Sequence, residues 1–561
     1  MQSLVAESKE LLRQRLREAV GRAQARGKLP ELPLGEILIS PPKDRAHGDF
    51  ATNLALVLAG SAKMPPARVA AAIAAEIEAV EPVARVETAG PGFINFFLSP
   101  SWREEALRRA IAQGADYGRT SVLAGRRIQV EFVSANPVGP LNVVNARAGA
   151  LGDSLARVLA FAGAAVEREY YINDHGVQVA LLGRSVEARC RELRGEPVEF
   201  PEEGYRGDYV YDLAREFLAE APPGFWERPE DERVEACREF ALARILASQR
   251  ADLESYGIHY DRWFSERELH RRGEVERVFR GLAEAGHVYE REGAMWLRTT
   301  RFGDDKDRVL LTNDGRPTYL LADIAYHLDK LGRGFDRIID IWGPDHHGHV
   351  IRMKAALAAA GADPERLEVL IAQQVNLLRD GQPVKMSKRA GEFVTLRELV
   401  DEVGNDAARF YFLLRSAESH LDFDLSLAVA QSNENPVYYI QYAHARVASI
   451  MRQAETRGGF AGADLLRFPP GRLLEAEEMR LADTVALLPE VVAEAAVLRE
   501  PHRLTGYLME LAGIFHAYYN KHRVLTDDEG LTHARLALVR AVQIAIANGL
   551  GLLGVSAPER M

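Results

Sequence analysis

The stretch of sequence that decides the fold reads Val-Glu-Phe-Val-Ser-Ala-Asn-Pro-Val-Gly-Pro-Leu-Asn-Val-Val-Asn-Ala-Arg and covers residues 130–147. It continues an apolar, β-rich run that starts at Ile128, and two prolines together with Gly139 interrupt this run. A helical pattern of apolar residues follows over residues 141–163, and a second strand pattern covers residues 166–172. Strand, turn, helix and strand in this order predict a βαβ unit with two parallel strands.

The turn of this unit carries two asparagines, Asn142 and Asn145, in the first turn of the predicted helix. Residues three positions apart share one face of a helix. A helix N-terminus has free N–H groups and partial positive charge, which suit a phosphate, and two side-chain amides would add neutral donors. On spacing alone an ordinary helix cap explains the asparagines equally well, so the rest of the chain must decide.

The bulk composition describes a soluble globular protein of several domains. With 561 residues the chain exceeds what one hydrophobic core supports, because cores stop growing at roughly 250–300 residues. We therefore expect roughly two to four domains. An apolar content of 47% and a charged content of 27% are ordinary for such proteins.

The cysteine count and the start of the chain favour a cytoplasmic location. Cys190 and Cys237 are the only cysteines, which speaks against a disulfide framework and suits a reducing compartment. Residues 1–18 form a charged amphipathic pattern and not a signal peptide. No stretch approaches the ~20 consecutive apolar residues that a bilayer-spanning helix needs, so we expect no membrane association.

The pattern of elements predicts three domains. Residues 1–115 read as a small α+β domain, and residues 116–430 alternate strands and helices, with a charged helical insertion near residues 184–250. Such alternation predicts an α/β domain with a doubly wound, mainly parallel sheet. Strand signals largely vanish after Glu398, and residues 431–561 read as an α-helical bundle, in which residues 479–498 form one amphipathic helix.

Two loops of the predicted α/β domain carry polar residues suited to a nucleotide. Gly343-Pro-Asp-His-His-Gly-His349 follows an apolar strand, and ligands gather at the carboxyl ends of strands in doubly wound sheets. Its histidines lack the spacing of a usual zinc site and have no cysteine nearby, so we expect no metal site. The second loop, residues 384–391, places Lys385 and Lys388 around a small polar centre. Alone it would be solvated surface, but after a strand–turn–helix phosphate site it is more specific.

The helical C-terminal domain interleaves tyrosines with basic residues. Tyr438, Tyr442 and Arg446 share one predicted helix, and aromatic and basic side chains together can stack and hold unpaired RNA bases. Part of the tyrosines would instead belong to the core. The net charge of −11 argues against a general nucleic-acid coat protein, but a local basic surface is enough for RNA.

Several motifs give the chain an end-to-end resemblance to bacterial arginyl-tRNA synthetases, which are class I aminoacyl-tRNA synthetases. The core motifs are Tyr171-Ile-Asn-Asp-His-Gly-Val-Gln178, Trp263-Phe-Ser-Glu266, Tyr319-Leu-Leu-Ala-Asp323, Trp342-Gly-Pro-Asp-His-His-Gly-His349 and Lys385-Met-Ser-Lys-Arg389. The outer motifs are residues 47–53 and 89–98, which resemble the additional domain that binds the tRNA D-loop corner, and residues 406–409, 435–444 and 547–561, which resemble the anticodon-binding region. The resemblance implies a Rossmann-like catalytic domain between these two.

The same resemblance implies the activity, the partners and the site residues. The expected enzyme is an arginine–tRNA ligase, a cytoplasmic and monomeric protein whose partners are L-arginine, the tRNA for arginine and ATP with Mg²⁺, and whose adenylate forms only with tRNA bound. The expected catalytic residues are Asn142, Asn145, Lys385 and Lys388. The expected ATP-binding residues are Gly139, Asn142, Asn145, Gly343, Asp345, His346, His349, Lys385, Met386, Ser387 and Lys388. The expected arginine-binding residues are Ser134, Asn136, Glu266, Tyr319, Asp323 and His346, and the expected tRNA-binding residues are Asn53, Phe93, Asn95, Tyr438, Tyr442 and Arg446.

One motif departs from the class I pattern. The His-Ile-Gly-His signature reads Asn142-Val-Val-Asn145, so both imidazoles are replaced by amides and the glycine by Val144. An amide still donates to a phosphate oxygen, but it carries no charge, and Val144 would narrow the room for the adenine ring. A catalytically impaired tRNA-binding paralogue is therefore an alternative. A different class I synthetase, such as one for cysteine, is disfavoured because the chain lacks a cysteine–histidine zinc cluster and has the N-terminal domain.

Overall fold

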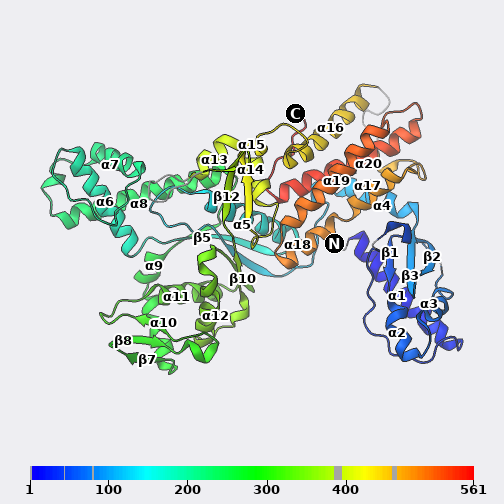
Figure 1. Ribbon diagram of the computed structural model, residues 1–561, viewed down its shortest axis with the longest axis horizontal. Helices are drawn as coiled ribbons and strands as arrows, with labels where there is room; N and C mark the ends of the chain where they lie inside the picture. Colours follow the sequence, from blue (N-terminus) through cyan, green and yellow to red (C-terminus); the bar gives the residue numbers. More distant parts are fainter. Residues whose placement is uncertain (1–2, 43, 79–80, 385–393, 458–463) are drawn as a thin grey trace.

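The computed structural model describes residues 3–42, 44–78, 81–384, 394–457 and 464–561. Figure 1 shows a small N-terminal domain, a central parallel sheet, a helical arm that projects from this sheet, and a helical bundle that lies between the sheet and the N-terminal domain. The structure confirms the predicted fold class, in which an α/β domain with a parallel sheet lies between an N-terminal α+β domain and a C-terminal helical bundle in the sequence. The boundaries at residues 115 and 430 stay predictions.

The N-terminal domain has its own core. Helix α1 (Leu4–Ala25) packs with α2 (Leu54–Ala62) and α3 (Pro66–Ala74) around a three-stranded antiparallel sheet in the order β1-β3-β2. Its strands are β1 (Phe50–Thr52), β2 (Val83–Ala89) and β3 (Phe93–Leu98). Helix α4 (Pro100–Gln113) joins this domain to the C-terminal bundle, where Arg103 bridges Asp49 and Asp483 at 2.5 and 2.8 Å.

The central sheet has five parallel strands in the order β11-β10-β4-β5-β6. The predicted βαβ unit is confirmed, because β4 and β5 are parallel neighbours joined by the helix α5. Strand β4 has β5 on one side and β10 on the other, so the chain reverses direction across the sheet at β4. Ligands bind at this switch point in doubly wound sheets. The bounds are β4 (Arg127–Glu131), α5 (Val143–Phe161), β5 (Ala165–Ile172), β6 (Arg262–Ser265), β10 (Arg337–Trp342) and β11 (Leu367–Ile371).

Two insertions extend this sheet. The first is a helical arm of α6 (Val177–Leu193), α7 (Asp208–Glu220) and α8 (Glu230–Ser255), and its separate core buries both free cysteines. The second contains a small antiparallel sheet in the order β7-β8-β9, flanked by helices. Its elements are α9 (Glu266–Arg271), α10 (Glu274–Glu284), β7 (Val288–Arg291), β8 (Ala294–Leu297), β9 (Arg308–Leu311) and α11 (Tyr319–Gly332). Helix α12 (His347–Ala359) instead connects β10 to β11.

The C-terminal part differs from the prediction in two details. Strand β14 (Leu421–Asp424) lies after Glu398, where the sequence shows few strand signals. The sequence pattern does not reveal it, because it is short and pairs in parallel with the distant β12 (Val375–Arg379). The helix predicted over residues 479–498 is two helices, α17 (Ala476–Ala486) and α18 (Leu488–Leu498), since Pro489 at the start of α18 lacks the N–H that a continuous helix needs. The other elements are β13 (Gln382–Pro383), α13 (Leu396–Val403), α14 (Asn405–Phe412), α15 (Leu425–Ala428), α16 (Pro436–Thr456), α19 (His502–Lys521) and α20 (Glu529–Leu552).

Helix α20 needs one further correction. It is long and apolar enough to cross a membrane by length and hydropathy, although no such stretch was expected from the sequence. However, 78% of the apolar window is buried inside the protein, where α20 packs against α4, α16 and α19. It is a core helix of the bundle.

Candidate active site

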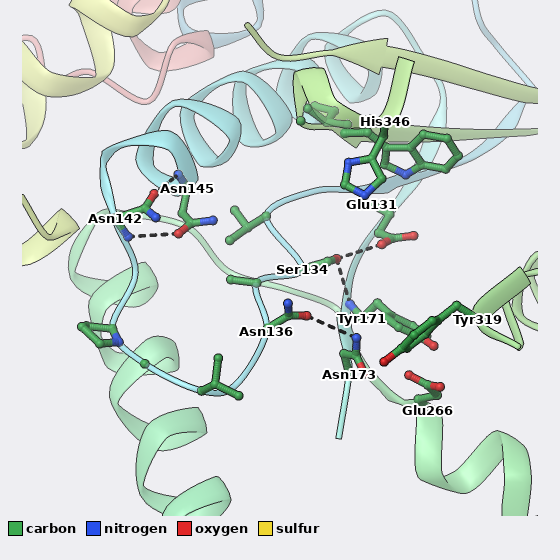
Figure 2. A pocket seen from close by; sticks show the side chains of 18 of the residues that line it. Glu131, Ser134, Asn136, Asn142, Asn145, Tyr171, Asn173, Glu266, Tyr319 and His346 are labelled. Atoms are coloured by element: carbon green, nitrogen blue, oxygen red, sulfur yellow. Dashed lines mark hydrogen bonds between the residues drawn. The ribbon is translucent and has the colours of Figure 1, made fainter. Parts of the chain in front are cut away.

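A cavity of about 1280 Å³ opens at the carboxyl ends of β4, β5 and β10, beside the switch point. Its walls come from the loop after β4, the start of α5, helix α11 and residues 204–209 of the helical arm. Figure 2 shows Asn142 and Asn145 at one end of the cavity, Tyr319 and Glu266 at the other, and Ser134 and Asn136 between them. Residues from the two predicted subsites therefore line one continuous space.

At the first end the two asparagines cap each other. The Asn142 Oδ1 accepts the backbone N–H groups of Val144 and Asn145 at 2.9 and 3.1 Å, and the Asn145 Oδ1 accepts the N–H of Asn142 at 3.0 Å. The N–H groups of Val143 and Ala146 donate to backbone oxygens of Val394 and Asn142. The expectation of free backbone N–H groups at this helix start is therefore wrong.

The donors that remain for an anion are the Nδ2 groups of the same asparagines. Each Oδ1 is committed to backbone N–H groups, which fixes the amide orientation and leaves the two Nδ2 groups without a partner among the described residues. Both side chains line the cavity. Val144 does not line it and is 37% exposed, so its side chain does not narrow the cavity as expected.

The segment that follows the lysine loop is attached to this turn. Lys385, Met386, Ser387 and Lys388 lie outside the described residues, but both flanking segments are placed. Before the loop, the Val384 N–H donates to Leu377 at 2.9 Å. After it, Thr395 forms a β-bridge with Asn142, and the Leu396 N–H donates to Leu141 at 2.8 Å. Residues 394–396 therefore lie directly beside Asn142, where Thr395 also lines the cavity.

All six residues expected to contact arginine line the cavity. They come from the loop after β4, from α9 and α11, and from the segment after β10; they are Ser134, Asn136, Glu266, Tyr319, Asp323 and His346. The Glu266 side chain is buried, at 4% exposure, and the Asp323 carboxylate accepts a hydrogen bond from His349 Nε2 at 3.1 Å. The pKa of Tyr171 is raised well above its usual value, first by burial and then by the charges of Glu266 and Asp323.

Ser134, which lines the cavity, lies in a loop with a strained backbone. Val133 and Ser134 have φ angles of 69° and 38°, which non-glycine residues rarely adopt, and each such residue costs on the order of 1–3 kcal/mol. The Ser134 Oγ donates to Glu131 at 2.8 Å and accepts the N–H of Tyr171 at 3.1 Å (Figure 2). These two hydrogen bonds hold the strained loop, and strain of this kind is typical of binding sites.

Beneath the cavity lies a buried charge cluster that the sequence analysis missed. Lys330 Nζ pairs with Glu131 and, at 2.8 Å, with Asp340, while His327 Nε2 lies 2.9 Å from Asp340. Burial opposes the charges, but Lys330 and His327 outweigh it and lower the pKa of Asp340 to about 2. The sequence did contain a sign of this cluster, namely Asp340 inside the apolar strand Arg337–Trp342. A charged side chain buried in such a strand needs a partner of opposite charge.

Only some of the remaining residues expected to bind ATP line the cavity. Gly139, Gly343, His346 and His349 line the cavity, whereas Asp345 is exposed and does not. The Tyr209 hydroxyl of the helical arm donates to the Val138 carbonyl at 2.6 Å, and its ring packs on Gly139. The arm therefore supplies a wall of the cavity that the sequence analysis did not foresee.

The residues expected to bind tRNA lie in two places. On α16, the Tyr438 and Tyr442 rings are parallel at 6.1 Å, and the Arg446 guanidinium lies 4.8 Å from the Tyr442 ring. In the N-terminal domain Asn53 is half-buried and Phe93 is exposed, but Asn95 is only 3% exposed. Asn95 is therefore buried in the free protein.

The comparisons with known proteins agree with this geometry. Three family models match: "Arginyl tRNA synthetase N terminal domain" over residues 7–98, "tRNA synthetases class I (R), catalytic domain" over residues 106–412 and "DALR anticodon binding domain" over residues 440–561. The fold and the site thus define a class I aminoacyl-tRNA synthetase, an aminoacyl-tRNA ligase.

Full-length relatives identify the family within this class. An arginine–tRNA ligase of Desulforamulus reducens is 47% identical and covers 100% of both chains, and one of Desulfosudis oleivorans is 50% identical over 99% of this chain and 100% of the relative. The solved arginyl-tRNA synthetase of Thermus thermophilus superposes with a TM-score of 0.73 at 26% identity, covering 98% of this chain and all of that one. The chain belongs to the arginyl-tRNA synthetase family.

Proposed function

We propose that this protein is an active arginine–tRNA ligase. It activates L-arginine with ATP to arginyl-adenylate, releases pyrophosphate, and transfers arginine to the 3′-terminal adenosine of its tRNA. One observation carries this proposal: Glu266 and the two amides suited to a phosphate line opposite ends of one cavity, which Asp323 also lines. The matches to an arginyl-tRNA synthetase N-terminal domain and to a DALR anticodon-binding domain, on either side of the catalytic domain, agree with it.

Arginine selection rests on Glu266 and Asp323. A guanidinium is a planar fork of five N–H donors, and two carboxylates can accept from it in paired hydrogen bonds. A lysine ammonium cannot reach both acids in this manner. It would leave a buried acceptor unsatisfied, at a cost of about 1–3 kcal/mol per group. Because Glu266 is buried, it contributes most to this discrimination.

Adenylate formation needs positioned donors and not a covalent nucleophile. A carboxylate oxygen of arginine attacks the α-phosphorus, the bond to the bridging oxygen breaks, and pyrophosphate leaves with Mg²⁺, which enters as the ATP complex. Donors aimed at the phosphates stabilise the charge that develops. The Nδ2 groups of Asn142 and Asn145 fill this role, and Lys385 and Lys388 supply the positive charge that the amides lack. The attachment of residues 394–396 to the Asn142 turn supports this assignment.

Transfer to tRNA uses both outer domains. On α16, Tyr438 and Tyr442 offer aromatic faces on which unpaired bases can stack, and Arg446 offers a cation. In the N-terminal domain, the exposed Phe93 offers a further stacking face. A terminal-adenosine hydroxyl then attacks the arginyl carbonyl, and AMP leaves. We propose a cytoplasmic, monomeric enzyme in which tRNA binds before the adenylate forms.

The test is ATP–pyrophosphate exchange with arginine, run with and without the tRNA for arginine. Exchange that requires both arginine and tRNA would support the proposed function and show that the two asparagines suffice in place of histidines. Exchange with another amino acid would reassign the substrate. If the protein binds tRNA but shows no exchange, the catalytically impaired paralogue would be favoured. Nothing in the geometry of the site supports that alternative.

A further inference from the structure

A group of metal-ligating side chains lies beside the cavity, where the sequence analysis expected none. The group consists of His175, in the loop after β5, with Glu266 and His270 on α9. One potential ligand atom from each lies within 4.8 Å of the other two. His175 and His270 do not line the cavity, whereas Glu266 does. The histidines at residues 346–349, which the sequence had drawn attention to, do not belong to this group.

The fold holds these three side chains together before any ligand arrives. Glu266 and His270 are four residues apart, so they share one face of α9, and His270 Nε2 lies 3.5 Å from Glu266 Oε1. The His175 and His270 rings stack with centroids 4.2 Å apart and an angle of 24°. Asp174 attaches the loop to the helix by accepting the Ser265 hydroxyl at 2.7 Å and the Arg267 N–H at 2.9 Å.

We propose that His175, Glu266 and His270 form a binding site for a borderline divalent cation such as Zn²⁺. Two imidazoles and a carboxylate are a ligand set that Zn²⁺ uses, with a fourth position left for water, whereas Mg²⁺ prefers oxygen ligands. Zinc bonds of about 2.1 Å place tetrahedral ligands roughly 3.4 Å apart. The distance of 3.5 Å between His270 Nε2 and Glu266 Oε1 matches this spacing, and His175 offers a ligand atom within 4.8 Å of one on each of these residues.

The charges around the group favour a cation. Glu266 belongs to the group, and Asp174 directly precedes His175 in the loop that carries it. The nearest guanidinium, that of Arg267, is engaged by Glu239 at 2.9 Å and by the Asp174 carbonyl at 3.2 Å.

Occupation of this site would act on arginine binding. Glu266 is the buried carboxylate proposed to accept the arginine guanidinium, and a metal ion on it would neutralise that charge and take its lone pairs. The cation and arginine should therefore compete. This consequence rests on the proposed function, but the metal site itself does not.

The direct test is a titration of the metal-free, full-length protein with Zn²⁺ alone, in competition with a chromophoric chelator. We expect one equivalent at this site, with at least about tenfold weaker binding in His175→Gln and in His270→Gln. His522→Gln is the matched control, because it disrupts the second candidate group, Glu475, Glu477 and His522, and should leave this equivalent unchanged. Binding that is absent, that is equal in both variants and the parent, or that disappears only in His522→Gln would overturn the proposal. With Co²⁺ as probe, visible absorption bands of tetrahedral intensity should appear and should be lost in His270→Gln.

A second measurement separates the metal site from the arginine site. Saturating arginine should weaken Zn²⁺ binding, and Zn²⁺ should raise the KM for arginine in pyrophosphate exchange. His270→Gln should keep its exchange rate but lose most of this inhibition. An affinity for Zn²⁺ that saturating arginine leaves unchanged would support the metal site but overturn the inference that Glu266 serves both the metal ion and arginine. Exchange without any zinc binding would support the proposed function and overturn the metal site.

Discussion

The reciprocal cap of Asn142 and Asn145 allows stability and catalysis to be separated at one side chain. The Asn142 Oδ1 serves the helix through two hydrogen bonds of 2.9 and 3.1 Å, whereas its Nδ2 is the proposed donor to phosphate. Asn142→Asp keeps the oxygen and removes the donor. Asn142→Ala removes both, and Asn142→His restores a donor but not the cap.

The expected magnitudes follow from these two roles. Loss of the cap in Asn142→Ala should cost about 1 kcal/mol, while Asp is as good a cap as Asn and gains from the helix dipole. Loss of a preorganised donor to a developing oxyanion costs about 2.7–4 kcal/mol, which is a 10²- to 10³-fold fall in rate. Asn142→Asp and Asn142→Ala should therefore both lose exchange activity, and Asn142→His should retain most of it.

Two assays read the two roles independently. Hydrogen–deuterium exchange of the Val144 and Asn145 amides reports the cap, and these amides should exchange about fivefold faster in Asn142→Ala and Asn142→His but not in Asn142→Asp. Pyrophosphate exchange reports the donor. An Asn142→Asp variant with activity within threefold of the parent would refute the reasoning, because the amide would then not contact the phosphates.

Four further outcomes are expected. Lys330→Met should destabilise the protein by about 3–5 kcal/mol in urea unfolding, since it removes the buried cation that Glu131 and Asp340 share and leaves Asp340 only His327, and a loss below about 1 kcal/mol would contradict the pairing. Burial lowers the pKa of His327, but the hydrogen bond to Asp340 and the charges of Asp340 and Asp323 together outweigh it and raise the pKa. The contribution of His327 is therefore fully present below its unfolded value of 6.5 and is lost as pH rises through the raised pKa. The stability gap between parent and His327→Gln, from thermal unfolding, should therefore shrink with rising pH, and a constant gap would exclude this. Asp323→Asn should raise the KM for arginine roughly tenfold or more with little change in the KM for ATP, and Arg446→Ala should raise the KM for tRNA while tRNA-saturated kcat stays near the parent value.

Much of the site was predictable because its residues follow strands of one parallel sheet. Ser134 and Asn136 come after β4, and His346 comes after β10, and the carboxyl ends of parallel strands meet at one edge. Asp323 lies on a helix whose side chains are not placed by this rule, and its position came from the family motif alone.

Other parts of the site depend on contacts that no local pattern encodes. Glu131, Lys330 and Asp340 are 10 to 209 positions apart along the chain, and nothing in their separate neighbourhoods indicates that one lysine neutralises two acids. The same holds for Tyr209, which reaches the Gly139 turn from the helical arm.

By itself the sequence determined the βαβ unit, the order of the domains and the class of chemistry, since apolar periodicity, turn residues and motifs are local properties of the chain. Only the tertiary structure decided which atoms of Asn142 and Asn145 are free to meet a ligand. It also decided that Asn95 is buried and that His175 meets Glu266 and His270. The physical reason is that hydrogen-bond saturation and burial depend on which segments pack together, and two positions with the same local sequence can end as a core contact or as a binding group.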